Sequence, residues 1–332
     1  MSSNFDLMSN MKPILIISGP TASGKTSLAL KLMKLLNGEL ISADSRQIYK
    51  GFDIGTGKDH PKNIKIHMID ILSPNIQYSV SQYRETALKI IKNIQSKGKL
   101  PIIVGGTGQY IQSLIESPRE TFDIKPNKLL RFFLNKFNVK TLQFIYKLLD
   151  KQKFSQLNHS DVNNPHRLIR KIEIKLSRSP LFKGRFPKGE RGFKIKNWNL
   201  KIKNYELKIK KYVHISLTAP NSYLFKNIDQ RVDERIKAGL FNEIRNLLKK
   251  YPWSAPAFRT HAYKEFEGVI AIRQTGKEAI PLEVINQWRF DEHRYVHRQK
   301  SYFKKIPNIH YFDITSSKYP QSVIDFVKKC YN

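Results

Sequence analysis

Cysteine, acidic residues and long apolar runs are scarce in this sequence. Cys330 is the only cysteine among 332 residues, which excludes an internal disulfide and a cysteine-based zinc site. The longest apolar runs have about the length of a β-strand, so we predict no membrane span. Residues 1–12 are rich in Ser and Asn, and they lack the features of a signal or transit peptide. We therefore expect a cytoplasmic protein that is not embedded in a membrane.

Basic residues greatly outnumber acidic ones. The chain has 59 Lys and Arg against 27 Asp and Glu, giving a formal net charge of +32. Part of the lysine excess reflects the overall composition, because the chain is also rich in Ile and Asn. A compositional bias of this kind would not by itself lower the number of acidic residues. The charge therefore favours a polyanionic partner, and we favour nucleic acid. With 40% hydrophobic residues, the chain can form one large or two modest cores.

Residues 19–26 read Gly-Pro-Thr-Ala-Ser-Gly-Lys-Thr and match the phosphate-loop pattern G-x-x-x-x-G-K-[ST]. The apolar run before this loop, residues 13–18, is predicted to be a buried parallel strand. Residues 27–36 after it have a helical pattern with leucines on one face. This strand–loop–helix context distinguishes a phosphate-binding loop from a chance glycine-rich turn.

Each fixed residue of the loop pattern has a physical role. Gly19 and Gly24 allow the backbone amides to point into one concavity, and Lys25 adds a positive charge for phosphate oxygens. The Thr26 hydroxyl is placed to bind Mg²⁺. The N-terminus of the following helix adds partial positive charge. The loop therefore predicts a bound diphosphate or triphosphate.

Polar residues also follow two further predicted strands. A strand over residues 39–43 ends at Asp44, and a strand over residues 100–104 runs into Gly105-Gly106-Thr107-Gly108. Ligands of open parallel sheets bind at the carboxyl ends of the strands, so these segments and the phosphate loop are expected to meet in one active site. Asp44 is then a candidate base close to the diphosphate. A purely structural role of the second glycine cluster, as a tight strand-to-helix turn, stays open.

The remaining segments extend this pattern. Further elements are predicted within residues 64–71 (strand), 80–95 (helix), 212–217 (strand), 221–250 (helical), 284–303 (helix) and 310–314 (strand). We expect an α/β fold, a P-loop NTPase-like doubly wound parallel sheet with an inserted, mostly helical domain. The core is predicted to comprise residues 11–117 and 206–332, and the insertion residues 118–205.

The insertion is predicted to carry a basic surface. A helix begins at Asn164-Pro165, and Arg167, Arg170 and Lys171 share one face of it without matching acids. Residues 181–211 contain eleven Lys and Arg, two Glu and interleaved aromatic residues. This composition suits an RNA backbone and unstacked bases, although the aromatic residues could equally anchor a surface hairpin.

His293 and His297 are spaced as i and i+4 on a predicted helix. The chain has no H-E-x-x-H pattern, and no third metal ligand is evident from the sequence. We therefore predict that both histidines are surface or RNA-facing residues and not zinc ligands.

Together these segments resemble the tRNA dimethylallyltransferases (tRNA isopentenyltransferases) over most of the chain. The most specific block is residues 41–56, which generic P-loop kinases do not have. Further similar segments are residues 19–26, 67–70, 78–80, 104–111, 167–173, 263–265 and 298–299. The chain departs from the family at Gly57 and Asp59, where Ala and Pro are usual, at Ala262, where Gly is common, and at His297, where Lys is frequent.

The resemblance implies transfer of a dimethylallyl group from its diphosphate to the exocyclic amine of adenosine 37, which must be extruded from the anticodon stem-loop. Lys25, Asp44 and Thr107 are the implied catalytic residues, with Asp44 accepting the amine proton. Mg²⁺ on Thr26 would stabilise the leaving diphosphate. The implied diphosphate site is Gly19, Pro20, Thr21, Ala22, Ser23, Gly24, Lys25, Thr26, Arg259 and Lys264. The implied tRNA site is Asp44, Ser45, Arg46, Gln47, His166, Arg167, Leu168, Ile169, Arg170, His297, Arg298 and Gln299.

Three alternatives remain at this point. A P-loop small-molecule kinase would explain the loop and Asp44, but not the charge or the basic insertion. A non-catalytic tRNA-binding protein is disfavoured because Lys25, Thr26, Asp44 and Thr107 are all present. Adenylate isopentenyltransferases use free nucleotides, which the high positive charge argues against. We expect a monomeric, Mg²⁺-dependent enzyme acting on tRNA and dimethylallyl diphosphate.

Overall fold

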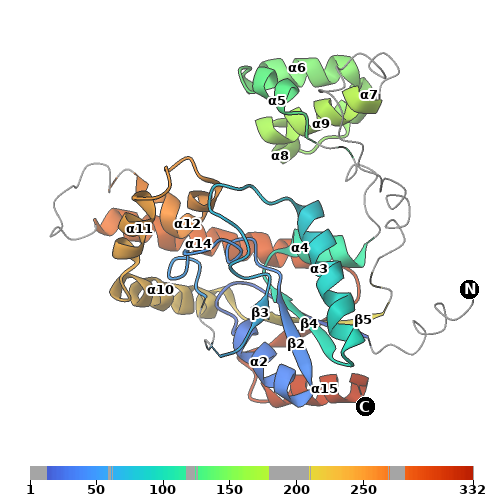
Figure 1. Ribbon diagram of the computed structural model, residues 1–332, viewed down its shortest axis with the longest axis vertical. Helices are drawn as coiled ribbons and strands as arrows, with labels where there is room; N and C mark the ends of the chain where they lie inside the picture. Colours follow the sequence, from blue (N-terminus) through green and yellow to red (C-terminus); the bar gives the residue numbers. More distant parts are fainter. Residues whose placement is uncertain are drawn as a thin grey trace, which may run out of the picture. The chain divides into compact units, whose positions relative to one another are not determined.

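The chain forms two compact units. The computed structural model describes residues 13–58, 61, 63–116, 124, 126–178, 209, 211–267, 269 and 281–331. Unit 1 comprises residues 1–117 and 207–332, and unit 2 comprises residues 118–206 (Figure 1). Each unit has its own hydrophobic core. Apart from Ile209 and Lys211, the predicted basic segment 181–211 lies outside the described residues.

Unit 1 is built on a six-stranded parallel sheet with the strand order β3-β2-β4-β1-β5-β6. The chain first extends the sheet on one side of β1 and then, with β5 and β6, on the other. This confirms the predicted doubly wound parallel sheet. The strands are β1 (Ile14–Ser18), β2 (Gly38–Ser42), β3 (Ile66–His67), β4 (Leu100–Gly105), β5 (Tyr212–Thr218) and β6 (Ile309–Asp313).

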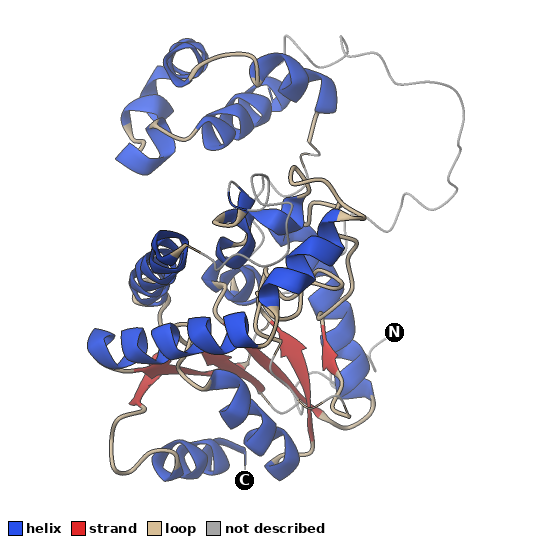
Figure 2. Cartoon of the chain, turned by 90° about the vertical axis from the view of Figure 1, so that its left-hand side faces the viewer, coloured by secondary structure: helices blue, strands red, loops and turns tan. Residues whose placement is uncertain are grey.

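Helices cover both faces of this sheet (Figure 2). On one face, α2 (Lys25–Leu35) and α15 (Gln321–Tyr331) pack on the outward side chains of the central strands. The other face is covered by α3 (Val80–Ser96), α4 (Gly108–Ile115), α10 (Asn221–Lys237) and α14 (Leu282–Phe303). Every residue of β1 and β4 is buried, which explains their continuous apolar runs. None of the described helices is both long and apolar enough to cross a membrane.

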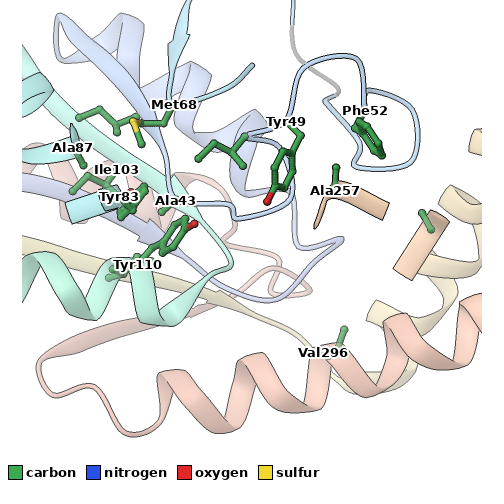
Figure 3. Close-up of a cluster of buried hydrophobic side chains, with 14 of the residues drawn as sticks. Ala43, Tyr49, Phe52, Met68, Tyr83, Ala87, Ile103, Tyr110, Ala257 and Val296 are labelled. Atoms are coloured by element: carbon green, nitrogen blue, oxygen red, sulfur yellow. The ribbon is translucent and has the colours of Figure 1, made fainter. Parts of the chain in front are cut away.

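Aromatic packing fixes the segment that follows β2. The rings of Tyr83 and Tyr110 stack with centroids 3.8 Å apart, and the Tyr83 hydroxyl donates a hydrogen bond to the Ser42 carbonyl (Figure 3). Further along, Phe52 packs against Phe258 and Tyr263, with ring centroids 5.0 and 4.7 Å apart. The loop between β2 and β3 is therefore held by helices from both halves of unit 1.

The predicted helical stretch over residues 221–250 consists of two helices. Gly239 adopts φ 94°, a left-handed conformation that glycine adopts without a steric penalty and that ends a helix. The stretch therefore divides into α10 and α11 (Leu240–Leu248), which are followed by the 3₁₀ helix η5 (Pro256–Arg259) and by α12 (His261–Lys264).

Unit 2 is helical, and its sequence explains where its helices begin. Asn127, Asn138, Asp150 and Asn158 each accept a hydrogen bond from a backbone amide in the first turn of a helix. The helices bury one apolar core, made of Leu134, Leu142, Tyr146, Leu168, Ile169 and Ile172. They are α5 (Lys128–Leu134), α6 (Val139–Leu149), α7 (Lys151–Ser155), α8 (His159–Val162) and α9 (Pro165–Arg178).

The carboxyl ends of β2 and β4 meet at very short range. The amide of Ala43 donates to the Val104 carbonyl at 2.7 Å, and the Ala43 carbonyl accepts from the Thr107 amide at 3.0 Å. A Cβ atom on Gly105 would lie 2.2 Å from the Ala43 carbonyl oxygen. Glycine is therefore required at position 105, because backbone on the opposing strand cannot move aside for a larger residue.

We expect Gly105→Ala to lower the free energy of unfolding by about 3 kcal/mol, because the added Cβ forces the two strand ends apart. Gly98→Ala is the matched control, since Gly98 has a positive φ but no atom within 4 Å of the added Cβ. In this control, backbone strain should lower the free energy of unfolding by only about 1 kcal/mol. Urea unfolding of both variants measures the difference, and equal losses would contradict the close approach at Gly105.

Candidate active site

The phosphate loop, Asp44 and Thr107 follow three neighbouring strands, β1, β2 and β4, as predicted. A cavity of about 360 Å³ opens where these strand ends meet helices α10 and α14. Its polar and charged lining includes Thr21, Lys25 and Thr26 of the loop, Asp44, Arg46 and Gln47 after β2, Asn227, Gln230, Arg231 and Arg235 of α10, and Glu292, Tyr295 and Gln299 of α14. The fold thus gathers cations, amides and two carboxylates around one cavity.

Lys25 is the half-buried cation of the phosphate loop. Its ammonium group donates to the Pro20 carbonyl at 2.5 Å. Burial lowers the pKa of Lys25 to about 8, the negative charge of Asp44 acts in the opposite direction, and the charge of Arg231 lowers it further. Removing a charged group from water disfavours its charged form. The ammonium therefore sits in a site that an anionic ligand would stabilise.

Gln299 of α14 ties the phosphate loop to the turn after β4. Its side-chain oxygen accepts from the Thr21 amide at 2.9 Å, and its side-chain nitrogen donates to the Gly106 carbonyl at 3.0 Å. Gln299 had been predicted to contact tRNA, but its side chain is buried among the loops of unit 1. Ala22 and Gly24 also line the cavity, whereas Gly19, Pro20 and Ser23 lie behind its surface.

Thr107 contacts Ser45, the residue that follows Asp44 in the chain. The Thr107 hydroxyl oxygen accepts from the Ser45 amide at 3.0 Å, and the Asp44 carboxylate accepts from the Arg46 amide at 2.8 Å. Asp44 lines the cavity, whereas Thr107 does not. The structure thus places Thr107 as a support for the turn that carries the candidate base.

Arg231 and Arg235 are cavity residues that the sequence analysis missed. They lie four residues apart on α10, whose sequence was interpreted only through its apolar face. The available signal was this i, i+4 pair of arginines on the polar face. Arg235 donates to the Gly55 carbonyl at 3.3 Å, and a Cβ atom on Gly57 would lie 2.1 Å from its guanidinium. Gly57, a departure from the family pattern, therefore leaves room for Arg235.

Several predicted ligand-binding residues do not reach the cavity. Arg259 is exposed on η5, and Lys264 is exposed on α12, where it lies 3.9 Å from Glu265. Neither lines the cavity. His297 and Arg298 are exposed on α14. His293, by contrast, is only partly exposed, because its ring contacts Asp229 at 2.9 Å and stacks on Phe225.

His261, Glu265 and Asp291 bring their ligand atoms within 4.8 Å of one another. Burial and the Asp291 carboxylate raise the pKa of Glu265, so the two carboxyl groups are expected to share a proton. Arg294 donates to Asp291 and offsets its charge. Burial lowers the pKa of His261 to about 4, which keeps the imidazole neutral. The cluster is therefore a coupled group of two carboxyls and an imidazole, in which His261 Nδ1 and Glu265 Oε1 have no hydrogen-bond partner among the described residues.

The RNA contacts predicted on α9 need two corrections. Leu168 and Ile169 are buried in the core of unit 2, so the prediction that they contact RNA is wrong for their side chains. The prediction that the basic face lacks matching acids is also wrong. Arg167 pairs with Asp161 at 2.7 Å, and Lys171 lies 3.3 Å from the same carboxylate.

Arg170 is likewise paired, because it donates to Glu173 and to the Ile124 carbonyl. Glu173 also binds Arg131 at 2.8 Å. Of the predicted RNA contacts in residues 166–170, His166 and Arg167 are exposed. Most of this face therefore stabilises unit 2 internally.

The fold and the cavity define a P-loop type of α/β protein with a site for an anionic ligand. A family profile described as IPP transferase matches residues 47–306. The chain belongs to this family.

Curated relatives support this assignment over nearly the whole chain. A tRNA dimethylallyltransferase from Roseiflexus sp. (strain RS-1) is 30% identical over 328 residues, covering 96% of this chain and 99% of the relative. A tRNA dimethylallyltransferase from Carboxydothermus hydrogenoformans is 34% identical over 306 residues, covering 90% and 91%.

Solved structures agree with these sequence matches. The full-length tRNA isopentenylpyrophosphate transferase from Bacillus halodurans has a TM-score of 0.64 and 27% identity, covering 96% of this chain and 97% of that one. A eukaryotic dimethylallyltransferase acting on tRNA has a TM-score of 0.74 at 22% identity, covering 96% and 80%, and so shares the fold.

The lowered pKa of Lys25 predicts a pH-dependent affinity for inorganic pyrophosphate. An anion favours the charged ammonium, so affinity should fall as pH rises through the pKa of about 8. Lys25→Arg is the control, because arginine stays charged at every pH tested. Calorimetry should show the affinity of the wild type, relative to this variant, falling about tenfold between about pH 7 and about pH 9. The ratio cancels the ionisation of pyrophosphate itself, and a constant ratio would contradict the prediction.

Proposed function

We propose that this protein transfers a dimethylallyl group from dimethylallyl diphosphate to the exocyclic amine of adenosine 37 in tRNA, giving isopentenyladenosine and diphosphate. The observation that carries this proposal is the meeting of the phosphate loop and Asp44 in one cationic cavity, in a chain of the IPP transferase family. Relatives named tRNA dimethylallyltransferase support tRNA as the acceptor. A phosphate loop serves here to hold a leaving group.

Departure of diphosphate is the step that needs positive charge. The bond between the allylic carbon and the diphosphate oxygen breaks, and both electrons go to that oxygen. Lys25, Arg231 and Arg235 line the cavity and would stabilise the charge developing there. Groups held in place before the reaction give such stabilisation without reorganisation.

Mg²⁺ suits the same place. Thr26 lines the cavity beside Lys25, and a threonine hydroxyl next to diphosphate oxygens provides the oxygen ligands that Mg²⁺ prefers. When bound, the ion would neutralise charge on the diphosphate. We propose Thr26 as its protein ligand.

Asp44 would complete the reaction as a general base. The adenosine amine forms a bond to the allylic carbon and must lose one proton, which the Asp44 carboxylate accepts. The Arg46 amide and the Thr107–Ser45 contact support the orientation of this carboxylate. Proton transfer to a held carboxylate is typically worth about 10²–10⁴-fold in rate.

Mass spectrometry of nucleosides tests the reaction. Unmodified tRNA is incubated with the protein, Mg²⁺ and dimethylallyl diphosphate, and Asp44→Asn is run alongside. We expect isopentenyladenosine from the wild type and a loss of about 10²-fold or more in the variant. Salt-sensitive tRNA binding without product would favour a non-catalytic RNA-binding protein. Consumption of ATP with a small-molecule acceptor would favour the kinase alternative.

Unit 2 offers a basic surface for the tRNA backbone. Within residues 126–178 all acidic side chains are engaged in ion pairs, namely Asp150, Asp161 and Glu173. The lysines at positions 128, 140, 147 and 151 are exposed and form no ion pair within the described part of the unit. Exposed lysines that no acid neutralises are suited to phosphate contacts. We propose that a monomer acts in the cytoplasm, where tRNA is available.

We expect Lys140→Glu with Lys147→Glu to weaken tRNA binding about tenfold and to lower its salt dependence by about two ions. Lys328→Glu with Lys329→Glu on α15 makes the same change in net charge and is the control. Filter binding over a range of salt concentrations measures both effects. Equal losses in the two double variants would indicate a response to net charge instead of a binding surface.

A further inference from the structure

Arg46, which the sequence analysis assigned to tRNA, is held inside unit 1. Its guanidinium donates to the Glu292 carboxylate at 2.8 Å. It also lies over the ring of Tyr295, 4.1 Å from the centroid. Glu292 itself is buried on α14, in a part of the sequence that matched no motif. The side chain of Arg46 is therefore engaged from two sides.

This pair lies immediately beside the candidate base. Asp44, Arg46, Glu292 and Tyr295 all line the same cavity. The backbone amide of Arg46 donates to Asp44 at 2.8 Å, so the position of residue 46 bears directly on the carboxylate. Thr107, which accepts a hydrogen bond from the Ser45 amide, acts to lower the raised pKa of Tyr295. One turn of α14 thus supports both residues that follow Asp44.

The charges in this group are balanced as a buried pair. Burial alone would raise the pKa of Glu292, but the positive charge of Arg46 above all, with that of Arg235, lowers it. Burial alone would lower the pKa of Arg46, and the Glu292 carboxylate, together with Tyr295 and Asp44, more than offsets this. Asp44 is another acid close enough to affect Arg46. Without Glu292, Asp44 would be the remaining carboxylate whose charge acts on the guanidinium.

We propose that Glu292 is a positioning residue for the base Asp44. It holds the Arg46 guanidinium away from the Asp44 carboxylate and fixes the Arg46 amide that binds this carboxylate. The inference rests on the proposed function, because it assigns a role within that reaction. If so, removing Glu292 alone should lower kcat more than removing both the Glu292 carboxylate and the Arg46 guanidinium.

The test compares Glu292→Gln with the double variant Arg46→Met/Glu292→Gln in the nucleoside assay. We expect Glu292→Gln to lower kcat by about 10–100-fold, because the released guanidinium pairs with the base. The KM for dimethylallyl diphosphate should change less than about threefold, since Lys25, Arg231 and Arg235 are untouched. The double variant also removes the Arg46 guanidinium, which would otherwise lack its carboxylate partner, and it should recover most of the lost kcat.

Matched measurements separate this role from a loss of folding. Asp233→Asn breaks the half-exposed ion pair between Asp233 of α10 and Arg289 of α14, the helix that carries Glu292, and it should leave kcat unchanged. Thermal melting and pyrophosphate binding confirm that each variant is folded. A wild-type kcat in Glu292→Gln would overturn the inference, as would a double variant no better than Glu292→Gln. An inactive wild type would instead refute the proposed function.

Discussion

Positive charge concentrated beside the Asp44 carboxylate is the constraint on which the rest of this structure depends. Lys25, Arg231 and Arg235 surround one cavity, and their mutual repulsion opposes folding while no anion is bound. The pKa of Lys25 is lowered mainly by burial, and the charge of Arg231 adds to this effect. Carbonyl groups of the phosphate loop and of the segment after β2 hold two of these cations, and Glu292 binds Arg46. The cations are therefore already held in place around a cavity that can bind an anionic ligand.

The parallel sheet makes this arrangement possible at short range. Its neighbouring strands end at the same edge, so the phosphate loop, Asp44 and the turn after β4 meet without long connections. The close approach of Gly105 to Ala43 keeps these ends together. Helices α10 and α14 then close the cavity from the second half of the chain and add the arginines and the Arg46–Glu292 pair. Unit 2 is a separately packed helical unit with its own hydrophobic core and basic surface.

Sequence reasoning succeeded where the signal is local. The loop at 19–26 and Asp44 belong to short strand–turn segments whose pattern predicts both their structure and their chemistry. It failed where a residue's surroundings come from distant parts of the chain. Leu168 and Ile169 are core residues of unit 2 because α6 packs on α9, and no single-helix pattern distinguishes this from an RNA-facing role. Gln299 is similar, since it joins two loops of unit 1 from far along the chain.

The sequence by itself determined the class of fold, the phosphate loop and the position of the candidate base, because strand and helix periodicity and a phosphate-binding turn are written in consecutive residues. The tertiary structure alone decided which cations surround the cavity and which side chains support Asp44. Arg231 and Glu292 lie on helices whose apolar faces dominate their sequence signal, and only the packing of α10 and α14 against the strand ends brings their polar faces to the site. Contacts between residues far apart in the chain depend on how the elements pack, and periodicity does not report this packing.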